Sequence, residues 1–179
     1  PLCNFGEKMQ SFKLLNIDNS FIDSASITGE KGTLIMFICN HCPYVKAVIS
    51  DIVNDCKSLH NLDVNSVAIC SNDVINYPED SFDKMIEFSN SNNFNFPYLH
   101  DETQEIARKY NAVCTPDFFG YNKNLELQYR GRIRELKDLK PLEDGDSDLY
   151  KAMKNISETG NGPKNQIPSM GCNIKWINS

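Results

Sequence analysis

The 179-residue sequence predicts a single α/β domain, because short apolar runs of strand length alternate along the chain with segments of helical periodicity. Residues 34–38 form one apolar run, and residues 64–70 form a second, β-branched run. Between them, residues 43–59 repeat apolar side chains at steps of three and four. Two strands joined by one helix are typical of neighbours in a sheet whose carboxyl ends lie close together. The length suffices for a full core without disulfide staples.

Local signals add the remaining elements. Ser81 and Asp101 are expected N-caps, and Pro116 interrupts a strand-like run. The expected elements are a strand at 11–17, helices at 82–90 and 102–110, a strand at 113–119, a hairpin through 122–124 to a strand at 125–129, and a helix at 147–156. Residues 135–179 are expected to be a C-terminal extension of the domain 1–179, and residues 170–176 are expected to pack back onto it.

Composition excludes some partners. The net charge is −6, the pI is near 5.0 and no Lys/Arg run is present, which argues against nucleic acid or an anionic membrane. The start lacks the basic and then apolar layout of a signal peptide, and we expect a cytoplasmic protein. The chain begins without Met, so an export signal removed from further upstream stays an open alternative. Seven cysteines are an odd number, which suits a reducing compartment and one or two redox pairs.

The most informative motif is Cys-Asn-His-Cys at residues 39–42, which Pro43 follows directly. Proline has no amide hydrogen and suits the first position of a helix, so Cys42 falls at or near the N-cap. There the unpaired amides and the positive end of the helix dipole stabilise a thiolate, which is the species that attacks peroxides and disulfides. We therefore predict that Cys42 is the nucleophile and that Cys39 is the resolving thiol.

Other interpretations of the motif stay open. Both thiols are inert in one of them, because free cysteines are often buried and reduced. A zinc site would use Cys39, His41 and Cys42, but zinc takes four ligands and the sequence offers no second Cys or His pair nearby. Haem attachment requires a His where Pro43 stands. We expect neither a metal nor another cofactor.

The order of elements, with a Cys-x-x-Cys turn between a strand and a helix and with Thr-Pro before a hairpin, resembles the thioredoxin fold. The resemblance implies a central mixed sheet flanked by helices, a cis peptide bond before Pro116, and a groove for an extended thiol partner. The expected groove residues are His41, Pro43, Thr115 and Pro116. His41 is also expected to tune the thiolate. In thioredoxin itself the first cysteine attacks, so the reverse assignment of the two thiols stays open.

Longer stretches resemble a narrower group, the peroxiredoxin-like proteins with Cys-x-x-Cys in the alkyl hydroperoxide reductase and thiol-specific antioxidant (AhpC/TSA) superfamily. The stretches that carry this resemblance are residues 39–46, 77–81, 97–105, 113–119, 129–133 and 171–176. In this group the second cysteine occupies the position of the peroxidatic thiol. The resemblance therefore implies the same role for Cys42.

The sequence departs from true peroxiredoxins at several positions. Ile35 and Cys39 replace the Pro and Thr that precede the peroxidatic cysteine. Because the Thr hydroxyl helps to orient the peroxide, its loss predicts a lower reactivity with peroxide, while an intramolecular resolving thiol is gained. The distant Arg of the family has no match within residues 113–119. Its candidates are Arg130, Arg132 and Arg134, whose simpler interpretation is as solvated charges at the end of a strand.

We interpret the chain as a thiol-disulfide oxidoreductase that cycles between a Cys39/Cys42 dithiol and disulfide. Its expected partner is a thiol or disulfide protein, such as a thioredoxin system, or a small thiol. One alternative is a thiol peroxidase, an antioxidant that uses peroxide, in which Cys42 is peroxidatic and Cys39 resolves. Another is a non-catalytic redox sensor or binding module. Cys172 is a candidate third redox thiol, with ordinary packing as its alternative.

Overall fold

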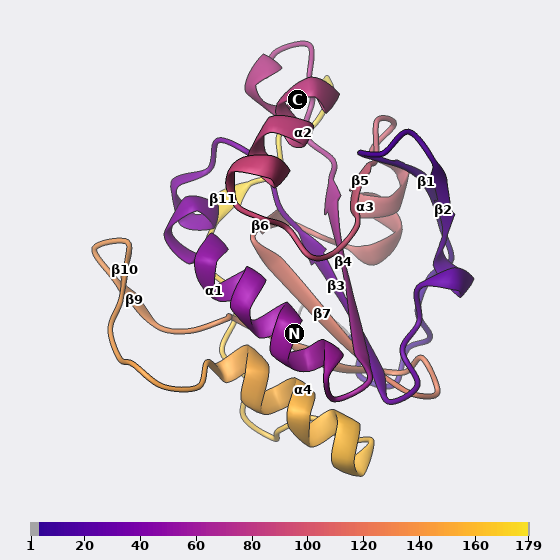
Figure 1. Cartoon of the computed structure of the whole chain (residues 1–179), viewed down its shortest axis with the longest axis vertical. Helices are drawn as coiled ribbons and strands as arrows, with labels where there is room; N and C mark the ends of the chain where they lie inside the picture. Colours follow the sequence, from indigo (N-terminus) through magenta and orange to yellow (C-terminus); the bar gives the residue numbers. More distant parts are fainter. Residues whose placement is uncertain (1–3, 179) are drawn as a thin grey trace.

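The computed structural model describes residues 4–178, which form a seven-stranded mixed sheet flanked by helices (Figure 1). The strands of this sheet follow the order β2-β1-β5-β4-β3-β7-β8. Their bounds are Lys13–Asn16 (β1), Phe21–Asp23 (β2), Gly32–Phe37 (β3), Val64–Cys70 (β4), Tyr98–His100 (β5), Asp117–Asn122 (β7) and Leu127–Arg130 (β8). The helices are Pro43–His60 (α1), Phe82–Ser91 (α2), Glu105–Tyr110 (α3) and Asp148–Thr159 (α4).

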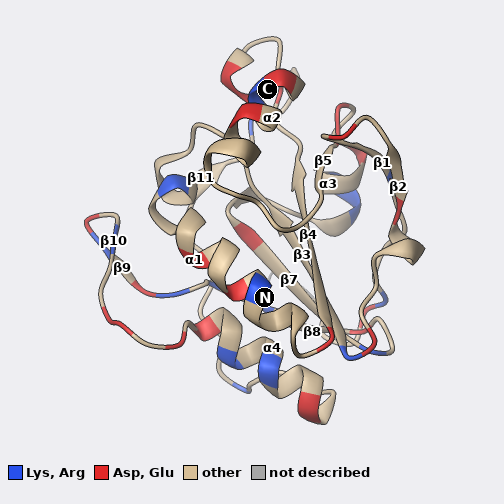
Figure 2. Ribbon diagram, in the orientation of Figure 1, with Lys and Arg blue, Asp and Glu red and all other residues tan. Residues whose placement is uncertain are grey.

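The centre of the sheet is the expected pair of parallel strands. β3 pairs with β4 in parallel and with β7 in antiparallel orientation, and β4 continues in parallel to β5. The central strands β3 and β4 carry no charged residue, and the charges lie on the surrounding elements (Figure 2). These pairings confirm the predicted α/β class and the mixed sheet.

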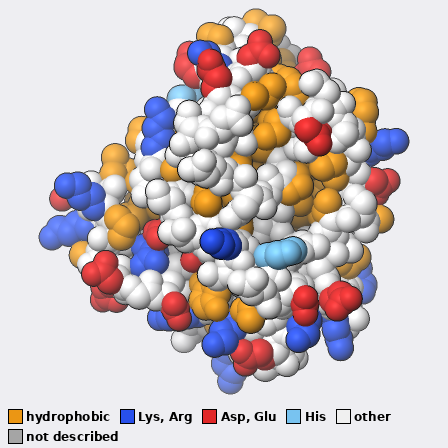
Figure 3. Space-filling view, viewed as in Figure 1, with side chains coloured by type: hydrophobic (Ala, Val, Ile, Leu, Met, Phe, Trp, Pro, Cys, Tyr) orange, Lys and Arg blue, Asp and Glu red, His pale blue; other side chains and the backbone are white. Residues whose placement is uncertain are grey.

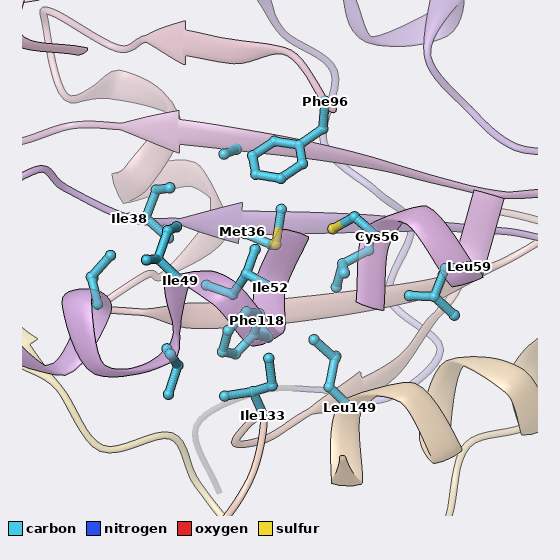
Figure 4. Packing of buried hydrophobic residues seen from close by; sticks show 14 of the residues in the cluster. Met36, Ile38, Ile49, Ile52, Cys56, Leu59, Phe96, Phe118, Ile133 and Leu149 are labelled. Atoms are coloured by element: carbon cyan, nitrogen blue, oxygen red, sulfur yellow. The ribbon is translucent and has the colours of Figure 1, made fainter. Parts of the chain in front are cut away.

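Each face of the sheet is covered by a separate hydrophobic core, since side chains alternate along a strand. From β3, Leu34 and Met36 face a core that includes residues of α1, α2 and α4 (Figure 4). Ile35 and Phe37 face the opposite core, which α3 and Ile174 complete. The sheet is therefore packed on both faces where β3 ends and the chain turns through the Cys-x-x-Cys motif into α1.

Some boundaries differ from those that the sequence predicts. The helix expected from residue 102 begins at Glu105, because Gln104 adopts a left-handed backbone conformation (φ 68°) that a helix does not accommodate. Asp101 nevertheless accepts hydrogen bonds from the amides of Ile106 and Ala107, so it caps the helix from further away than expected. The strand expected from residue 125 begins at Leu127, since Leu125 also has a positive φ (61°).

The C-terminal extension adds two short strand pairs and a helix, all outside the seven-stranded sheet. A small hairpin of β9 (Leu136–Lys137) and β10 (Lys140–Pro141) is followed by α4, which packs beside α1. β11 (Cys172–Asn173) then pairs with β6 (Cys114–Thr115), the short strand before Pro116. The predicted return of residues 170–176 to the domain is thus confirmed for the segment around β11.

Acidic and basic side chains are interspersed on the face drawn in Figure 3, and hydrophobic side chains are visible between them. Within residues 4–178, no helix combines the length and the apolar character that crossing a membrane would require.

Candidate active site

Three sulfur atoms meet at the N-terminus of α1. Cys39 follows β3, Cys42 is the N-cap of α1, and Cys172 lies in β11, far along the chain. The sulfur atoms of Cys42 and Cys172 are 2.8 Å apart. Cys39 and Cys42 are almost wholly buried, with exposed fractions of 1% and 0%, whereas Cys172 is partly exposed. The extension therefore brings a third thiol to the Cys-x-x-Cys motif.

The loop between β6 and β7 forms the opposite wall of the site. The peptide bond between Thr115 and Pro116 is cis, as the resemblance to the thioredoxin fold implies. The Thr115 hydroxyl lies 3.4 Å from the sulfur of Cys39, and its carbonyl oxygen lies 3.3 Å from the sulfur of Cys42. Thr115 and Pro116 are both buried. These two residues thus stand directly against the cysteines.

The two thiols of the motif have opposite acidities. The hydrogen bond from the Cys39 side chain lowers the pKa of Cys42 to about 4, and a hydrogen bond from Cys172 and one from the backbone of Val45 act in the same direction. The same bond to Cys42, together with burial, raises the pKa of Cys39 above its usual range. One proton is therefore held on Cys39 while Cys42 is a thiolate.

The Thr115 carbonyl acts against this thiolate. The oxygen at 3.3 Å accepts a hydrogen bond from a protonated Cys42, and this bond is lost when the sulfur ionises. Two thiols and a helix N-terminus oppose that one carbonyl, so the stabilisation of the thiolate is the larger effect.

Sequence reasoning missed a buried carboxylate beside Cys39. Asp80 has an exposed fraction of 0% and accepts hydrogen bonds from the Asn40 amide and the Asn72 side chain, both at 2.8 Å. Its negative charge also raises the pKa of Cys39. Asp80 stands in the 77–81 stretch of the family resemblance, which is the one signal in the sequence that pointed to it.

Asp80 also holds His41, one of the four residues that the sequence assigns to the groove. The His41 Nδ1 atom lies 2.7 Å from a carboxylate oxygen of Asp80, and the ring stacks on Tyr77 with 6.0 Å between ring centroids. His41 thus lies on the Asp80 side of the motif, whereas Thr115 and Pro116 lie on the Cys172 side. Pro43 is exposed at the start of α1.

The same corner offers donor atoms of the kinds that metals bind. One donor atom each from Cys39, His41 and Asp80 lies within 4.8 Å of the others, the only such group of three among residues 4–178. Zinc takes thiolate, imidazole and carboxylate ligands but requires a fourth ligand. The proton that the Cys42 hydrogen bond keeps on Cys39 also opposes metal binding, because a metal binds the thiolate. This donor set therefore fits a metal poorly.

The three arginines considered for the site are paired with acidic residues instead. Arg130 lies 2.9 Å from Asp117, and its side chain is 6% exposed. Arg132 forms an ion pair with Asp148 at 2.7 Å, and Arg134 forms one with Asp51 at 2.9 Å. The interpretation of Arg130 as a solvated charge is wrong, because Asp117 and the Phe119 ring draw its guanidinium into the protein.

A cavity of about 410 Å³ adjoins Pro116 on the outer side of the loop. It lies between the first turns of α1, the segment 132–139 and the segment 167–170. Its apolar lining residues are Tyr44, Val48, Pro116, Ile133, Leu136, Leu139, Ile167, Pro168 and Met170. His41 does not line it but borders a separate, more open hollow with Lys46 and Glu79. The structure thus places His41 and Pro116 at different hollows, and Pro43 and Thr115 line neither of the two.

The remaining described cysteines differ from Cys42. Cys56, Cys70 and Cys114 are buried, and burial raises the pKa of each thiol to about 12. Cys56 and Cys70 belong to the hydrophobic core, where they act as packing residues. Among the described cysteines, only Cys42 therefore has a lowered pKa.

Comparisons with known proteins identify the family of this chain. The sequence matches the AhpC/TSA family over residues 5–136. This chain belongs to the AhpC/TSA family. No curated protein sequence gives a match. The family match spans β3, the Cys-x-x-Cys motif, α1 and the Thr-Pro loop, and it supports a redox function in general.

Solved structures extend the likeness to the whole chain. An uncharacterized conserved protein from Geobacillus kaustophilus is 37% identical with a TM-score of 0.93, covering 98% of this chain and 94% of that chain. A hypothetical protein from Sinorhizobium meliloti is 29% identical with a TM-score of 0.91, covering 99% and 97%. The likeness to these two structures includes the extension with α4 and β11, beyond the residues that the family match covers.

A more distant structure identifies the fold alone. A secreted disulfide oxidoreductase from Mycobacterium tuberculosis is 22% identical with a TM-score of 0.55, covering 65% of this chain and 80% of that chain. The predicted thioredoxin fold is thereby confirmed for this AhpC/TSA protein.

Proposed function

We propose that this AhpC/TSA protein is a thiol-disulfide oxidoreductase that cycles between a Cys39/Cys42 dithiol and disulfide. The observation that carries the proposal is the hydrogen bond between Cys39, which keeps its proton, and Cys42. The hydrogen bond from Cys39 lowers the pKa of Cys42 to about 4, so Cys42 is ionised at neutral pH. A thiolate at a helix N-terminus, beside a thiol that holds its proton, is equipped for exchange with a disulfide.

The reaction has two steps. The Cys42 thiolate attacks one sulfur of a partner disulfide, the partner's S–S bond breaks, and the second partner sulfur leaves as a thiolate. Cys39 then loses its proton to that leaving thiolate and attacks the Cys42 sulfur of the mixed disulfide. The Cys39–Cys42 bond forms and the partner leaves fully reduced. The protein loses two electrons, and an external thiol protein or small thiol restores them.

The partner class follows from the surroundings of the cysteines. The cavity beside Pro116 is lined by apolar side chains and by Arg132 and Arg134, which suits an extended peptide that carries a cysteine. We propose a thiol or disulfide protein, such as a thioredoxin system, and neither nucleic acid nor membrane. The net charge of −6 supports this choice. We also propose a cytoplasmic location, where reducing conditions keep the dithiol form available.

The test is exchange of the reduced protein with oxidised glutathione, followed by acid quenching, alkylation and mass mapping of the disulfide. Wild type is expected to form the Cys39–Cys42 disulfide. Cys39→Ser is expected to form a Cys42–glutathione mixed disulfide and no disulfide at residue 39, and Cys42→Ser is expected to remain reduced. Cys56→Ala is the matched control because Cys56 lies on the same helix, away from the N-terminus. A mixed disulfide found on Cys39 would reverse the roles of the two thiols.

One observation favours a second function, a thiol peroxidase. The Cys42 sulfur has an exposed fraction of 0%, so a small oxidant reaches it more easily than a protein does. In this reaction Cys42 would attack a peroxide oxygen, release water or an alcohol and become a sulfenic acid, with which Cys39 condenses to a disulfide and water. Stopped-flow mixing with hydrogen peroxide separates the two functions. Oxidation faster than exchange with glutathione would favour the peroxidase, and no disulfide with either oxidant would favour a sensor or binding module.

A further inference from the structure

The segment around Cys172 occupies the edge of the active-site loop. In the antiparallel pairing of β11 with β6, Cys172 is the partner of Thr115, and Asn173 is the partner of Cys114. This register holds the sulfur of Cys172 2.8 Å from that of Cys42. The short strand β11 thus lies beside Pro116, and its Cys172 contacts Cys42, the proposed nucleophile.

Contacts on both sides of Cys172 hold this segment in place. Upstream, the Ser169 hydroxyl donates to the Pro116 carbonyl at 2.7 Å. Downstream, Ile174 is buried in the second core and its amide donates to the Val113 carbonyl at 3.1 Å. Further along, the Lys175 amide donates to the Asn72 side chain at 2.9 Å. These contacts fix the position of Cys172 relative to the Thr-Pro loop.

Gly171 makes the close pairing feasible. A Cβ atom at this position would collide with the carbonyl group of Thr115, so a larger residue would push the segment away from β6. Gly171 therefore allows Cys172 to lie against Cys42. Substituting a larger residue for Gly171 would displace the Cys172 thiol without removing it.

We propose that residues 171–173 are an internal mimic of a substrate peptide and that Cys172 is a second resolving thiol, which forms a disulfide with Cys42. The proposal rests on the attack by Cys42 proposed above. An extended peptide commonly binds by adding a strand to an exposed edge, and here the chain itself supplies that strand. A protein partner that uses the same edge must first displace β11, whereas glutathione or a peroxide need not.

The exchange balances within the protein. When Cys42 carries a mixed disulfide, the Cys172 sulfur loses its proton and attacks the Cys42 sulfur. The bond from Cys42 to the partner breaks, and the partner leaves as a thiolate that takes up this proton. Cys39 can then attack Cys42 in turn, releasing Cys172 as a thiol and leaving the Cys39–Cys42 disulfide. The second step moves a disulfide and needs no oxidant.

The surroundings of Cys172 suit a temporary bond. Cys172 is partly exposed, whereas Cys39 is almost wholly buried, with an exposed fraction of 1%. Water stabilises a departing thiolate where it can reach the sulfur, so Cys172 is released more readily than Cys39. The Cys42–Cys172 disulfide is therefore expected as an intermediate in wild type and as the end product where Cys39 is absent.

The decisive experiment oxidises the full-length reduced Cys39→Ser variant with an equimolar amount of oxidised glutathione and maps the disulfides by mass spectrometry. The expected product is an intramolecular Cys42–Cys172 disulfide, formed from a transient Cys42–glutathione adduct. Adding Gly171→Val is expected to slow this step by roughly tenfold or more, because the two sulfurs lose their high effective concentration. Cys114→Ser is the matched control, since Cys114 lies on β6 and its loss leaves both sulfurs of the expected disulfide.

A Cys42–glutathione adduct that persists in Cys39→Ser would overturn the role of Cys172 and leave the proposed function intact. Absence of any adduct on Cys42, in this variant and in wild type, would refute the proposed function and the role of Cys172 together. Equal rates with and without Gly171→Val would refute the internal mimic, because the pairing with β6 would then contribute nothing.

Discussion

Cys42 and Cys56 lie on or directly before the same helix, and both are buried, yet their thiols differ in opposite directions from an ordinary cysteine. Burial raises the pKa of Cys56 to about 12. The hydrogen bond from Cys39 lowers the pKa of Cys42 to about 4. The exposed fractions are 4% and 0%, so exposure does not explain the difference.

The difference lies in the polar groups that each sulfur meets. Cys56 is in the fourth turn of α1, where it packs in the hydrophobic core and lies near the negative charge of Asp55. Cys42 meets two thiols and the amide end of the helix. Burial disfavours a charge only when nothing replaces the lost water, and hydrogen-bond donors replace it at Cys42. The hydrogen-bond donors at the N-terminus of α1 therefore account for the low pKa of Cys42.

The largest difference in the rate of disulfide exchange is expected between a substitution of Cys42 and a substitution of Cys56. Cys42→Ser is expected to slow disulfide exchange by roughly 10³-fold or more, because a serine hydroxyl is not ionised at neutral pH. Cys56→Ala should leave the exchange rate near that of wild type and cost about 1 kcal/mol in the free energy of unfolding. Exchange with glutathione and urea unfolding measure these two quantities. Similar losses of exchange in both variants would contradict the contrast.

Removing the donor at residue 39 tests the cause of the low pKa. Cys39→Ala is expected to raise the pKa of Cys42 from about 4 toward its usual value, because the hydrogen bond is lost. Cys39→Ser keeps a hydroxyl donor and should raise the pKa of Cys42 less than Cys39→Ala does. Ultraviolet absorbance of the thiolate against pH measures the shift, since the thiols of Cys56, Cys70 and Cys114 titrate much higher, at about 12. Equal shifts in both variants would exclude the hydrogen bond as the main cause.

The two cysteines should also affect stability at opposite ends of the pH range. The pKa of Cys42 is depressed in the folded protein. Its contribution to the free energy of unfolding is therefore complete above the ordinary pKa of 9.0 and is lost as the pH falls toward about 4. Cys56 has a raised pKa, so its contribution is complete below 9.0 and is lost as the pH rises toward about 12. Urea unfolding of the reduced wild type, Cys42→Ala and Cys56→Ala across this range measures both differences.

In these unfolding experiments, each variant serves as the control for the other. The difference between wild type and Cys42→Ala should shrink on acidification, and the difference between wild type and Cys56→Ala should shrink in alkali. Two differences with the same sign of pH dependence would show that the thiols do not hold opposite protonation states in the folded protein.

The sequence was sufficient to predict the fold and the centre of the site. The apolar face of α1 and the Pro at its first position placed Cys42 at an N-cap, because both signals are local. The Thr-Pro loop followed from the family resemblance, and its position beside the cysteines is visible in the contacts of Thr115. Roles in catalysis for these residues stay predictions.

Other parts of the site depend on contacts between distant segments, which local patterns do not encode. Asp80 reaches Cys39 only because the loop after β4 folds over the motif. Cys172 is 130 residues from Cys42 along the chain, and no periodicity predicts the pairing of β11 with β6. The expected helix start at 102 was wrong because the left-handed conformation of Gln104 is not apparent from the residue type.

The smallest effect is expected from substituting Asp80, the carboxylate near Cys39. Asp80→Asn removes a negative charge that raises the pKa of Cys39, and the neutral amide retains an oxygen that can accept the Asn40 amide hydrogen bond. The reduced pair, which carries the thiolate, is thereby stabilised relative to the disulfide. The reduction potential should rise by roughly 10 to 30 mV, since 30 mV corresponds to about 1.4 kcal/mol for two electrons.

Equilibration in glutathione redox buffers measures this potential. Asp55→Asn is the matched control, because it removes a partly buried carboxylate near Cys56 and leaves the groups around Cys42 unchanged. Its potential should equal that of wild type. If Asp55→Asn and Asp80→Asn shift the potential equally, the effect is one of net charge alone. If only Asp80→Asn does, the donors and charges at the N-terminus of α1 act locally, as the contrast between Cys42 and Cys56 requires.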